Sequence, residues 1–424
     1  MTQTTFNDLY DHTVICNVMG YNAGTTTTDD IYRISDQLSI QKDKLLKSFI
    51  NHNPMHPVSL FNKPLLLSDG LAERKTLANT KLWQKYLELK KDKSPADDEY
   101  FDLFDIVIAL NQEACLEVGI DPIEVMYFND PIIGDYNTIM GIVSRMAGIS
   151  KQFINEGWNN GKNIDWQGFQ GDYIQNVLFK YLDTHNIQYT VSDKNGSFMS
   201  AIDKDTARIH ISDKESVVNM KSSVYHEAGH ALYQTKVLSK NTDVGKLGGC
   251  ISLSLHESSS IIFERQYDCF NGTVSHNTNN GYRLRADKIH YVLHIYIRMK
   301  IEEMLFNNEI KARDIPKIWN KLMVDIIGIT PENDWRGFLQ DVHWSSGAFG
   351  YFHSYAIGFF NAMTMPDITN HNKDKTNAII SCIDGWYGKY NEYSFDIIND
   401  MHPCLDSSFK AYKESIKDNF NMYK

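Results

Sequence analysis

Hydrophobic residues recur along most of the chain at the spacing of amphipathic helices. In DYIQNVLFKYLD, residues 172–183, the apolar side chains of Ile174, Val177, Leu178 and Leu182 fall on one helical face. The segments FDLFDIVIALNQEACLEVG and DKIHYVLHIYIRMKIEEMLF show the same period. No repeat or low-complexity linker divides the sequence. The pattern therefore predicts a mainly α-helical protein.

Two short segments alternate instead of following the helical period. In IQYTVSD (187–193) and TARIHIS (206–212), polar and β-branched residues alternate, which predicts two strands. A further helical pattern follows, and Ser212 or Asp213 is a good N-cap for it, with Glu215 in the first turn. The apolar residues of this helix are Val217, Met220, Val224 and Leu232. We expect a small sheet that leads into a helix.

The composition is that of an ordinary globular protein. The chain has 424 residues, of which 42% are hydrophobic, so it can form one large domain or two coupled halves. Its 53 acidic and 42 basic residues give a formal net charge of -11, and the basic residues are spread along the sequence. This distribution argues against a nucleic-acid partner.

The cysteines and the N-terminal segment indicate a cytoplasmic protein. The six cysteines are too scattered for a disulfide framework or a C-x-x-C metal site, and they suit a reducing compartment. The segment MTQTTFNDLYDHTVIC has no signal-peptide pattern, and no segment approaches the roughly 18 apolar residues of a membrane span. We therefore expect no membrane partner.

The segment VYHEAGHALYQ, residues 224–234, contains the pattern H-E-x-x-H. His226 and His230 are one helical turn apart, so their side chains can reach the same metal ion. Glu227 lies about 100° round the helix from His226, where it can act as general base on a metal-bound water. The chain has 15 histidines, and roughly 3 chains in 100 of this composition would contain the pattern by chance. The motif therefore needs a third ligand.

A carboxylate from a later helix can be that third ligand, because a catalytic zinc site has three protein ligands and one open position. Glu257, in LHESSSIIFE (255–264), follows His230 by 27 residues, and the segment between them contains enough Gly, Asn and Asp to turn the chain back. Glu264 lies seven residues later, on nearly the same helical face. From spacing alone, Glu257 is either a metal ligand or a solvated residue at a helix start.

Four segments together resemble the Taq-type thermostable metallocarboxypeptidases, a family of HExxH gluzincin enzymes. The segments are HEAGHALY, LHESSSIIFE, YRLRADKIHYVLHIYIR and FLQDVHWSSGAFGYFHSY, and they occur in the family's order. The resemblance implies a large helical zincin-type fold with a deep central cleft and a small β-sheet next to the metal helix. It also implies a homodimer in which residues 1–424 form one catalytic domain, with a shortened N-terminal helical region over about residues 1–100.

The resemblance assigns the metal site residue by residue. It makes His226, His230 and Glu257 the metal ligands and Glu227 the general base. The implied cofactor is one divalent metal ion, zinc first and cobalt as the alternative, since both accept this ligand set.

The resemblance also implies substrate-binding residues. Arg283, in RLRAD, would pair with the free carboxylate of a peptide, because a guanidinium can bind a carboxylate through two parallel hydrogen bonds. Arg285 lies about 200° away round the helix and should face elsewhere. Tyr351, Tyr355 and His343 become candidates for binding the substrate carbonyl or its oxyanion. For the tyrosines, core packing is the alternative, since the chain contains 23 of them.

The chain also departs from the family pattern. Where the family usually has His-Pro-Phe and an Arg-x-Thr strand, this chain has NGSF (195–198) and RIHI (208–211). We therefore expect an altered strand at the edge that faces the substrate. His353 stands where the family usually has proline.

These observations predict a metal-dependent carboxypeptidase that removes single C-terminal residues from peptides by attack of a metal-activated water. One alternative is a gluzincin oligopeptidase, which shares the metal site but cuts internal bonds. Another is a catalytically silent helical binding protein. Cleavage of peptides with blocked C-termini would indicate the first alternative, and the absence of both bound metal and turnover would indicate the second.

Overall fold

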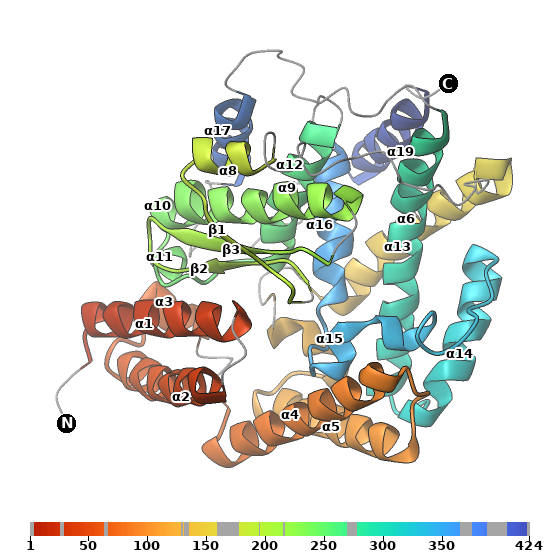
Figure 1. Ribbon diagram of the computed structural model, residues 1–424. Helices are drawn as coiled ribbons and strands as arrows, with labels where there is room; N and C mark the ends of the chain where they lie inside the picture. The colour runs from red at the N-terminus through yellow and green to blue at the C-terminus, as the bar shows by residue number, and fades with distance from the viewer. Residues whose placement is uncertain are drawn as a thin grey trace. The chain divides into compact units, whose positions relative to one another are not determined.

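The protein is mainly helical with one small sheet, as its sequence predicts (Figure 1). The computed structural model describes residues 4–25, 29–62, 67–128, 130, 135–158, 178–194, 196–214, 217–268, 278–364, 375–387 and 405–421. The chain divides into two compact units, each built from three separate stretches of sequence. Unit 1 comprises residues 1–63, 163–277 and 361–401, and unit 2 comprises residues 64–162, 278–360 and 402–424.

Unit 1 contains the sheet and the helices that surround it. Its described helices are α1 (Phe6–Thr25), α2 (Asp29–His52), α3 (Pro57–Asn62), α8 (Lys180–Thr184), α9 (Val217–Tyr233), η5 (Gln234–Leu238), α10 (Ser239–Asn241), α11 (Asp243–Lys246), α12 (Leu253–Asp268) and α17 (Lys375–Tyr387). Its strands are β1 (Gln188–Ser192), β2 (Phe198–Ala201) and β3 (Ala207–Ser212). Most of the helix predicted at 172–183 lies outside the described residues, and only its end is seen, in α8.

The sheet has the order β1-β3-β2, with β1 parallel and β2 antiparallel to β3. The register pairs Gln188 with Arg208 and Phe198 with His210. Every residue of β3 except Arg208 is buried, as expected for a central strand. The two predicted strands, β1 and β3, are therefore confirmed. Strand β2 was not predicted, because its four residues are too few to show an alternating pattern.

The start of the metal helix, predicted near Ser212 or Asp213, falls at the end of β3. Ser212 is the last residue of β3 and pairs with Ser192, and the N–H of Asp213 donates to the Ser192 carbonyl at 3.0 Å. The Ser212 hydroxyl accepts from the Lys214 N–H at 3.3 Å. The described part of α9 begins at Val217, and Glu215 lies outside the described residues.

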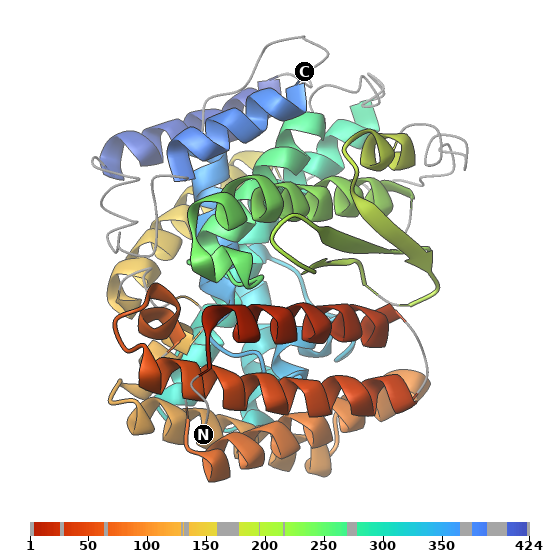
Figure 2. The same cartoon turned by 90° about the vertical axis from the view of Figure 1, so that its left-hand side faces the viewer.

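Two helices of the N-terminal region pack beside the sheet. Figures 1 and 2 both show α1 lying between α2 and the strands. The Tyr21 hydroxyl of α1 donates to the carbonyl of Ile209 in β3 at 2.9 Å, and the Tyr21 ring lies 5.9 Å from that of Phe198. A buried phenol that satisfies a backbone carbonyl in this way fixes α1 against the sheet.

The described part of unit 2 contains helices joined by turns and loops, and no strand. Its elements are α4 (Asp69–Asp92), α5 (Asp98–Glu117), η2 (Pro122–Phe128), α6 (Tyr136–Phe153), η3 (Ile154–Trp158), α13 (Thr278–Phe306), η6 (Ala312–Asp314), α14 (Ile315–Leu322), η7 (Met323–Ile327), η8 (Phe338–Gln340), α15 (Val342–Ser345), α16 (Phe352–Thr364) and α19 (Leu405–Asn421). Asp97 and Asp135 cap α5 and α6 by accepting from backbone N–H groups. The helices predicted in FDLFDIVIALNQEACLEVG and DKIHYVLHIYIRMKIEEMLF are confirmed as α5 and part of α13.

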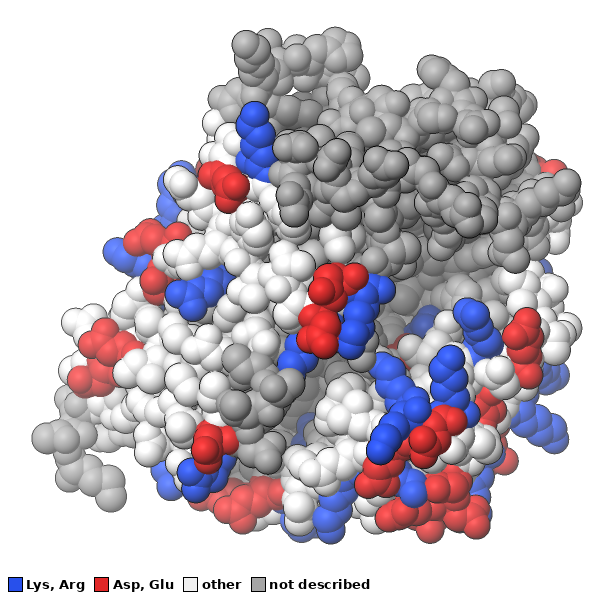
Figure 3. Space-filling view, viewed as in Figure 1, with Lys and Arg blue, Asp and Glu red and all other residues white. Residues whose placement is uncertain are grey.

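The surface mixes charges of both signs. On the face in Figure 3, acidic and basic side chains lie beside one another. Within the described part of the chain, none of the helices is both long and apolar enough to cross a bilayer.

Candidate metal and catalytic site

The structure brings together His226, His230 and Glu257, the three predicted metal ligands. The Nε2 atoms of the two histidines are 3.2 Å apart, and Glu257 Oε2 lies 3.5 Å from the first and 3.7 Å from the second. One donor atom from each residue lies within 4.8 Å of the others. A tetrahedral zinc ion with ligands at 2.0–2.2 Å holds its donor atoms about 3.3 Å apart. Two imidazoles and one carboxylate in this arrangement fit such an ion.

Close packing of α12 on α9 makes this convergence possible. A Cβ added to Gly229, inside the H-E-x-x-H motif, would lie 2.8 Å from the Ser260 Cα and 3.0 Å from the Phe263 Cβ. Only glycine allows the two helices to approach this closely. The contact places Glu257, one turn before Ser260, beside the two histidines.

A second carboxylate on α12 holds the first histidine. Glu264 Oε2 lies 3.4 Å from His226 Nδ1, on the ring nitrogen away from Glu257, and its other oxygen accepts from Ser222 Oγ. A carboxylate on the far nitrogen of a metal-binding histidine fixes the ring orientation and tautomer. Sequence reasoning placed Glu264 on the face of Glu257 but assigned it no role, although the seven-residue spacing is a usable signal.

Burial and neighbouring charges set opposite protonation tendencies for the two histidines. Burial lowers the pKa of His226, but the hydrogen bond that its ring donates to Glu264 and the negative charges of Glu257 and Glu227 outweigh burial and raise that pKa to about 9. Burial, followed by the nearby His256 and His226, holds the pKa of His230 well below its usual value. The carboxylates around His226 therefore make the cluster favourable for a cation.

His256 forms the wall behind His230. The two rings stack with their centroids 4.3 Å apart and 18° between their planes. Burial, together with the positive charge of His226, lowers the pKa of His256 to about 4, which keeps its ring neutral. A neutral ring in this position limits the directions in which His230 can turn.

Glu227 lies next to the ligands but is not one of the clustered donors. It is 8% exposed, and its charge acts on His226. The role of Glu227 as general base stays a prediction.

In unit 2, His343, Tyr351 and Tyr355 lie together as one aromatic group. His343 Nε2 lies 3.2 Å from the Tyr355 hydroxyl, and the Tyr351 ring stacks on His343 with centroids 5.4 Å apart. The rings of the two tyrosines are 5.2 Å apart. The predicted oxyanion donors therefore share one site rather than being scattered in the core.

Asp341 orients His343, and the sequence analysis did not single out this aspartate. Its Oδ1 accepts from the His343 backbone N–H at 2.8 Å and lies 3.1 Å from His343 Nδ1, while Oδ2 pairs with Arg298 of α13. Burial raises the pKa of Asp341, but His343 and Arg298 lower it further than burial raises it. An ionised Asp341 can only accept, so Nδ1 of His343 carries a proton and Nε2 faces Tyr355.

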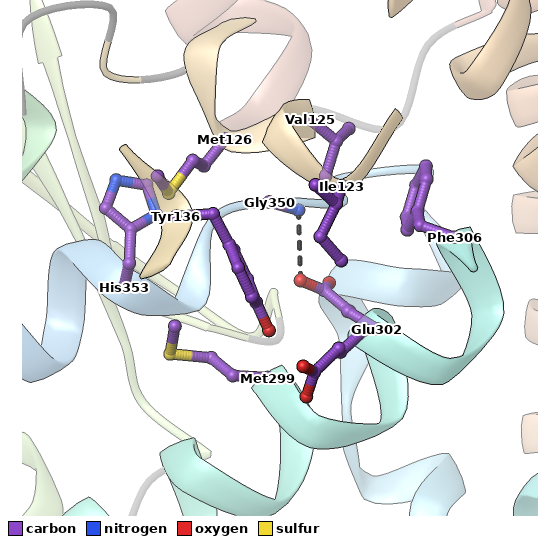
Figure 4. Close-up of a pocket in the computed structure, with 10 residues that line it drawn as sticks. Ile123, Val125, Met126, Tyr136, Met299, Glu302, Phe306, Gly350 and His353 are labelled. Carbon is purple, nitrogen blue, oxygen red and sulfur yellow. Dashed lines mark hydrogen bonds between the residues drawn. The ribbon is translucent and has the colours of Figure 1, made fainter. Parts of the chain in front are cut away.

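A buried glutamate holds the segment that carries these residues (Figure 4). Glu302 of α13 accepts from the Trp344 Nε1–H at 2.9 Å and from the Gly350 N–H at 3.2 Å. Burial raises the pKa of Glu302 to about 8. Gly350 has φ 64°, and a Cβ there would lie 2.5 Å from the Met126 nitrogen, so glycine is required just before Tyr351.

The predicted carboxylate anchor is not placed. Arg283 belongs to α13, but the side chains of 278–288, Arg285 included, lie outside the described residues. The role of Arg283 stays a prediction.

The chain matches a known family of enzymes. The family model described as carboxypeptidase Taq (M32) metallopeptidase matches residues 186–269 and 266–394. Carboxypeptidase 1 of Bacillus subtilis (strain 168) is 34% identical over 164 residues, which cover 32% of this chain and 32% of that protein. The match therefore spans about a third of that relative's length.

Solved structures share the fold over nearly the whole chain. An M32 carboxypeptidase from Deinococcus radiodurans R1 superposes with a TM-score of 0.75 at 18% identity, covering 99% of this chain and 97% of the other. Metallocarboxypeptidase 1 of Trypanosoma cruzi gives a TM-score of 0.70 at 18% identity, with 99% and 97% covered. The match to the family model shows that this chain belongs to the carboxypeptidase Taq (M32) metallopeptidase family.

Proposed function

We propose that this chain is a metal-dependent carboxypeptidase that removes single C-terminal residues from peptides. The observation that carries the proposal is the cluster of His226, His230 and Glu257, with Glu227 beside it. The names of the relatives, which are carboxypeptidases, support it. The alternatives are an oligopeptidase with the same metal site and a silent binding protein.

The three clustered residues would hold one divalent ion, zinc in our proposal. Such an ion would act as a Lewis acid and would lower the pKa of a bound water to about 7. Glu227 takes a proton from the attacking water and later gives it to the leaving amine. Glu264 keeps the His226 ring in its binding orientation through the contact at Nδ1.

The aromatic group of unit 2 would stabilise the negative charge that develops on the carbonyl oxygen. Tyr355, Tyr351 and His343 are the candidate donors, because they lie in one group whose histidine is oriented by Asp341. Hydrogen bonds aimed at a developing oxyanion are typically worth about 3 to 4 kcal/mol in the transition state.

Arg283 would bind the free carboxylate at the C-terminus of the substrate. An amidated peptide lacks that charge, so amidation should suppress cleavage strongly. Arg283→Ala should raise the barrier measured by kcat/KM by about 2 to 5 kcal/mol, as when one partner of a buried charged pair is lost. Arg285→Ala is the matched control and should change kcat/KM much less.

The deciding measurement is kcat/KM of the metal-loaded protein on one peptide in free-acid and amidated forms, for the wild type and both variants. Equal wild-type rates on the two forms would reject the carboxypeptidase and favour the oligopeptidase. A protein that binds no metal and cleaves neither peptide would favour the silent binding protein. A larger loss in Arg285→Ala would move the anchor by two residues and leave the enzyme class intact.

We further propose a cytoplasmic homodimer in which residues 1–424 form one catalytic unit. None of the four cysteines that the structure describes, Cys16, Cys115, Cys250 and Cys382, forms a disulfide bond, which suits a reducing compartment. Light scattering on the purified protein would test the dimer, and metal analysis would separate zinc from cobalt.

A further inference from the structure

Unit 1 contains a cavity of about 390 Å³ that the metal cluster does not use. Its walls come from α1, α2, β2 and the chain between η5 and the start of α12. Cavities of roughly 300 to 1,000 Å³ are the usual size for binding a small molecule or a side chain. The cavity is therefore large enough for one substrate residue.

The cavity reaches the back of the metal cluster. His256 lines it, and the same ring stacks on His230 with centroids 4.3 Å apart. A group held in the cavity therefore lies one ring away from a proposed metal ligand. This position beside the cluster makes the cavity a candidate pocket for a substrate side chain.

Helix α2 gives the cavity its chemical character. Ser35, Ser39 and Lys42 all line it, and their spacings of four and three residues put them on one helical face. Ser200 of β2 adds another hydroxyl, and Asn17 of α1 a carboxamide. Hydroxyls, an amide and an ammonium group are the donors that a carboxylate needs.

Lys42 is the only acidic or basic residue other than His256 among the described residues that line the cavity. Asp43, next in the sequence, is not part of the lining, although its charge acts on Cys16 in the lining and interacts with that of Lys42. The lining is thus complementary to a negatively charged group rather than to a cation.

We propose that this cavity binds the acidic side chain of a substrate's C-terminal residue, and that Lys42 determines this specificity. The inference rests on the proposed carboxypeptidase activity and adds a substrate class to it. Arg283 would pair with the terminal carboxylate, and Lys42 with the carboxylate of a glutamate or aspartate side chain.

Two peptides that differ only in a C-terminal Glu or Gln provide the test, because these side chains match in size and differ in charge. The metal-loaded wild type should cleave the Glu peptide with a kcat/KM about tenfold higher, the effect of one hydrogen bond to a charged group. Lys42→Met should reduce this ratio to about one. Lys44→Met, on the exposed side of α2, is the matched control and should keep the wild-type ratio.

Binding provides a readout that does not depend on turnover. In the Glu227→Gln background, calorimetry should show tighter binding of the Glu peptide, and Lys42→Met should remove the difference. Free glutarate tests whether the cavity instead binds a small free acid that carries the same carboxylate. Binding of glutarate without any preference between the peptides would overturn the inference, because the cavity would then serve a small free acid.

The outcomes separate the inference from the proposed function. A wild type that cleaves neither peptide contradicts the carboxypeptidase itself. A wild type that cleaves both equally, or a Lys42→Met variant with the wild-type preference and unchanged thermal stability, overturns the role of the cavity alone. If Lys42→Met fails to fold, Lys42→Gln with the same peptides decides the question.

Discussion

At the residue scale, side chains that are neighbours on α9 have different tasks. His226 and His230 point toward Glu257, whereas Glu227 lies about 100° round the helix from His226 and outside the clustered donors. Glu264 contacts the far side of His226. We therefore expect the two glutamates to affect different quantities, Glu227 the rate of the reaction and Glu264 the metal affinity.

Glu227→Gln should retain the metal and lower kcat by about 10² to 10⁴, because the amide keeps the shape but cannot accept a proton. Glu264→Gln is the matched control. It should weaken metal affinity by about tenfold and keep near wild-type turnover at saturating metal. Metal content and turnover of both variants are the measurements. Full activity of Glu227→Gln, with metal contamination excluded, would show that another group is the base.

The buried carboxyl group of Glu302 makes the stability of the protein depend on pH. Burial raises its pKa to about 8 in the folded protein, above the value of about 4.3 for an exposed glutamate. Below pH 4 Glu302 is protonated in both the folded protein and the unfolded chain, so its ionisation does not change the unfolding free energy there. As the pH rises toward 8, the unfolded chain loses the proton first, and the contribution of Glu302 to folding becomes increasingly unfavourable.

Between pH 5 and 8, the unfolding free energy of the wild type should therefore fall by about 1 to 3 kcal/mol more than that of Glu302→Gln. Denaturant titrations of both proteins at several pH values measure this difference. Parallel pH profiles would show that Glu302 stays ionised in the folded protein, held by its two hydrogen bonds from Trp344 and Gly350.

At the element scale, the site depends on how closely α12 approaches α9. Gly229 leaves no room for a Cβ against Ser260, and Glu257 lies one turn before Ser260 on α12. Any increase in the distance between the helices moves Glu257 away from both histidines. The glycine inside H-E-x-x-H therefore affects the metal site although it binds nothing.

Gly229→Ala should weaken metal affinity at least tenfold and destabilise the protein by about 1 to 3 kcal/mol, the usual cost of overpacking. Gly148→Ala in α6 is the matched control, because a Cβ there meets nothing within 4 Å. That control should be neutral or slightly stabilising. Metal titration and thermal unfolding compare the two. If both variants bind metal like the wild type, helix spacing does not limit the site.

At the scale of the whole molecule, a ligand that binds only the folded chain stabilises it. At a free metal concentration about 1,000 times Kd, the gain is about 4 kcal/mol. Chelation should therefore lower the unfolding temperature by several degrees, and returning zinc should restore it. Glu257→Ala should show almost no response to the chelator. An equal response in both proteins would place the stabilising metal elsewhere.

Most of the predictions that the structure confirms rest on residues that are close together in sequence. The i, i+4 spacing of His226 and His230 follows from helix geometry alone, and the periods of α5 and α13 and the alternation in β1 and β3 are equally local. The family resemblance then added Glu257, which is 27 residues from His230 and could not be assigned by spacing.

Only the tertiary structure decided which distant residues meet. The contact of Glu264 with His226, the pairing of Asp341 with Arg298, and the cavity with Lys42 all join elements far apart in the sequence. Side-chain chemistry and spacing determine what a helix can present, whereas packing between elements determines what it meets, because long-range contacts have no fixed period in sequence.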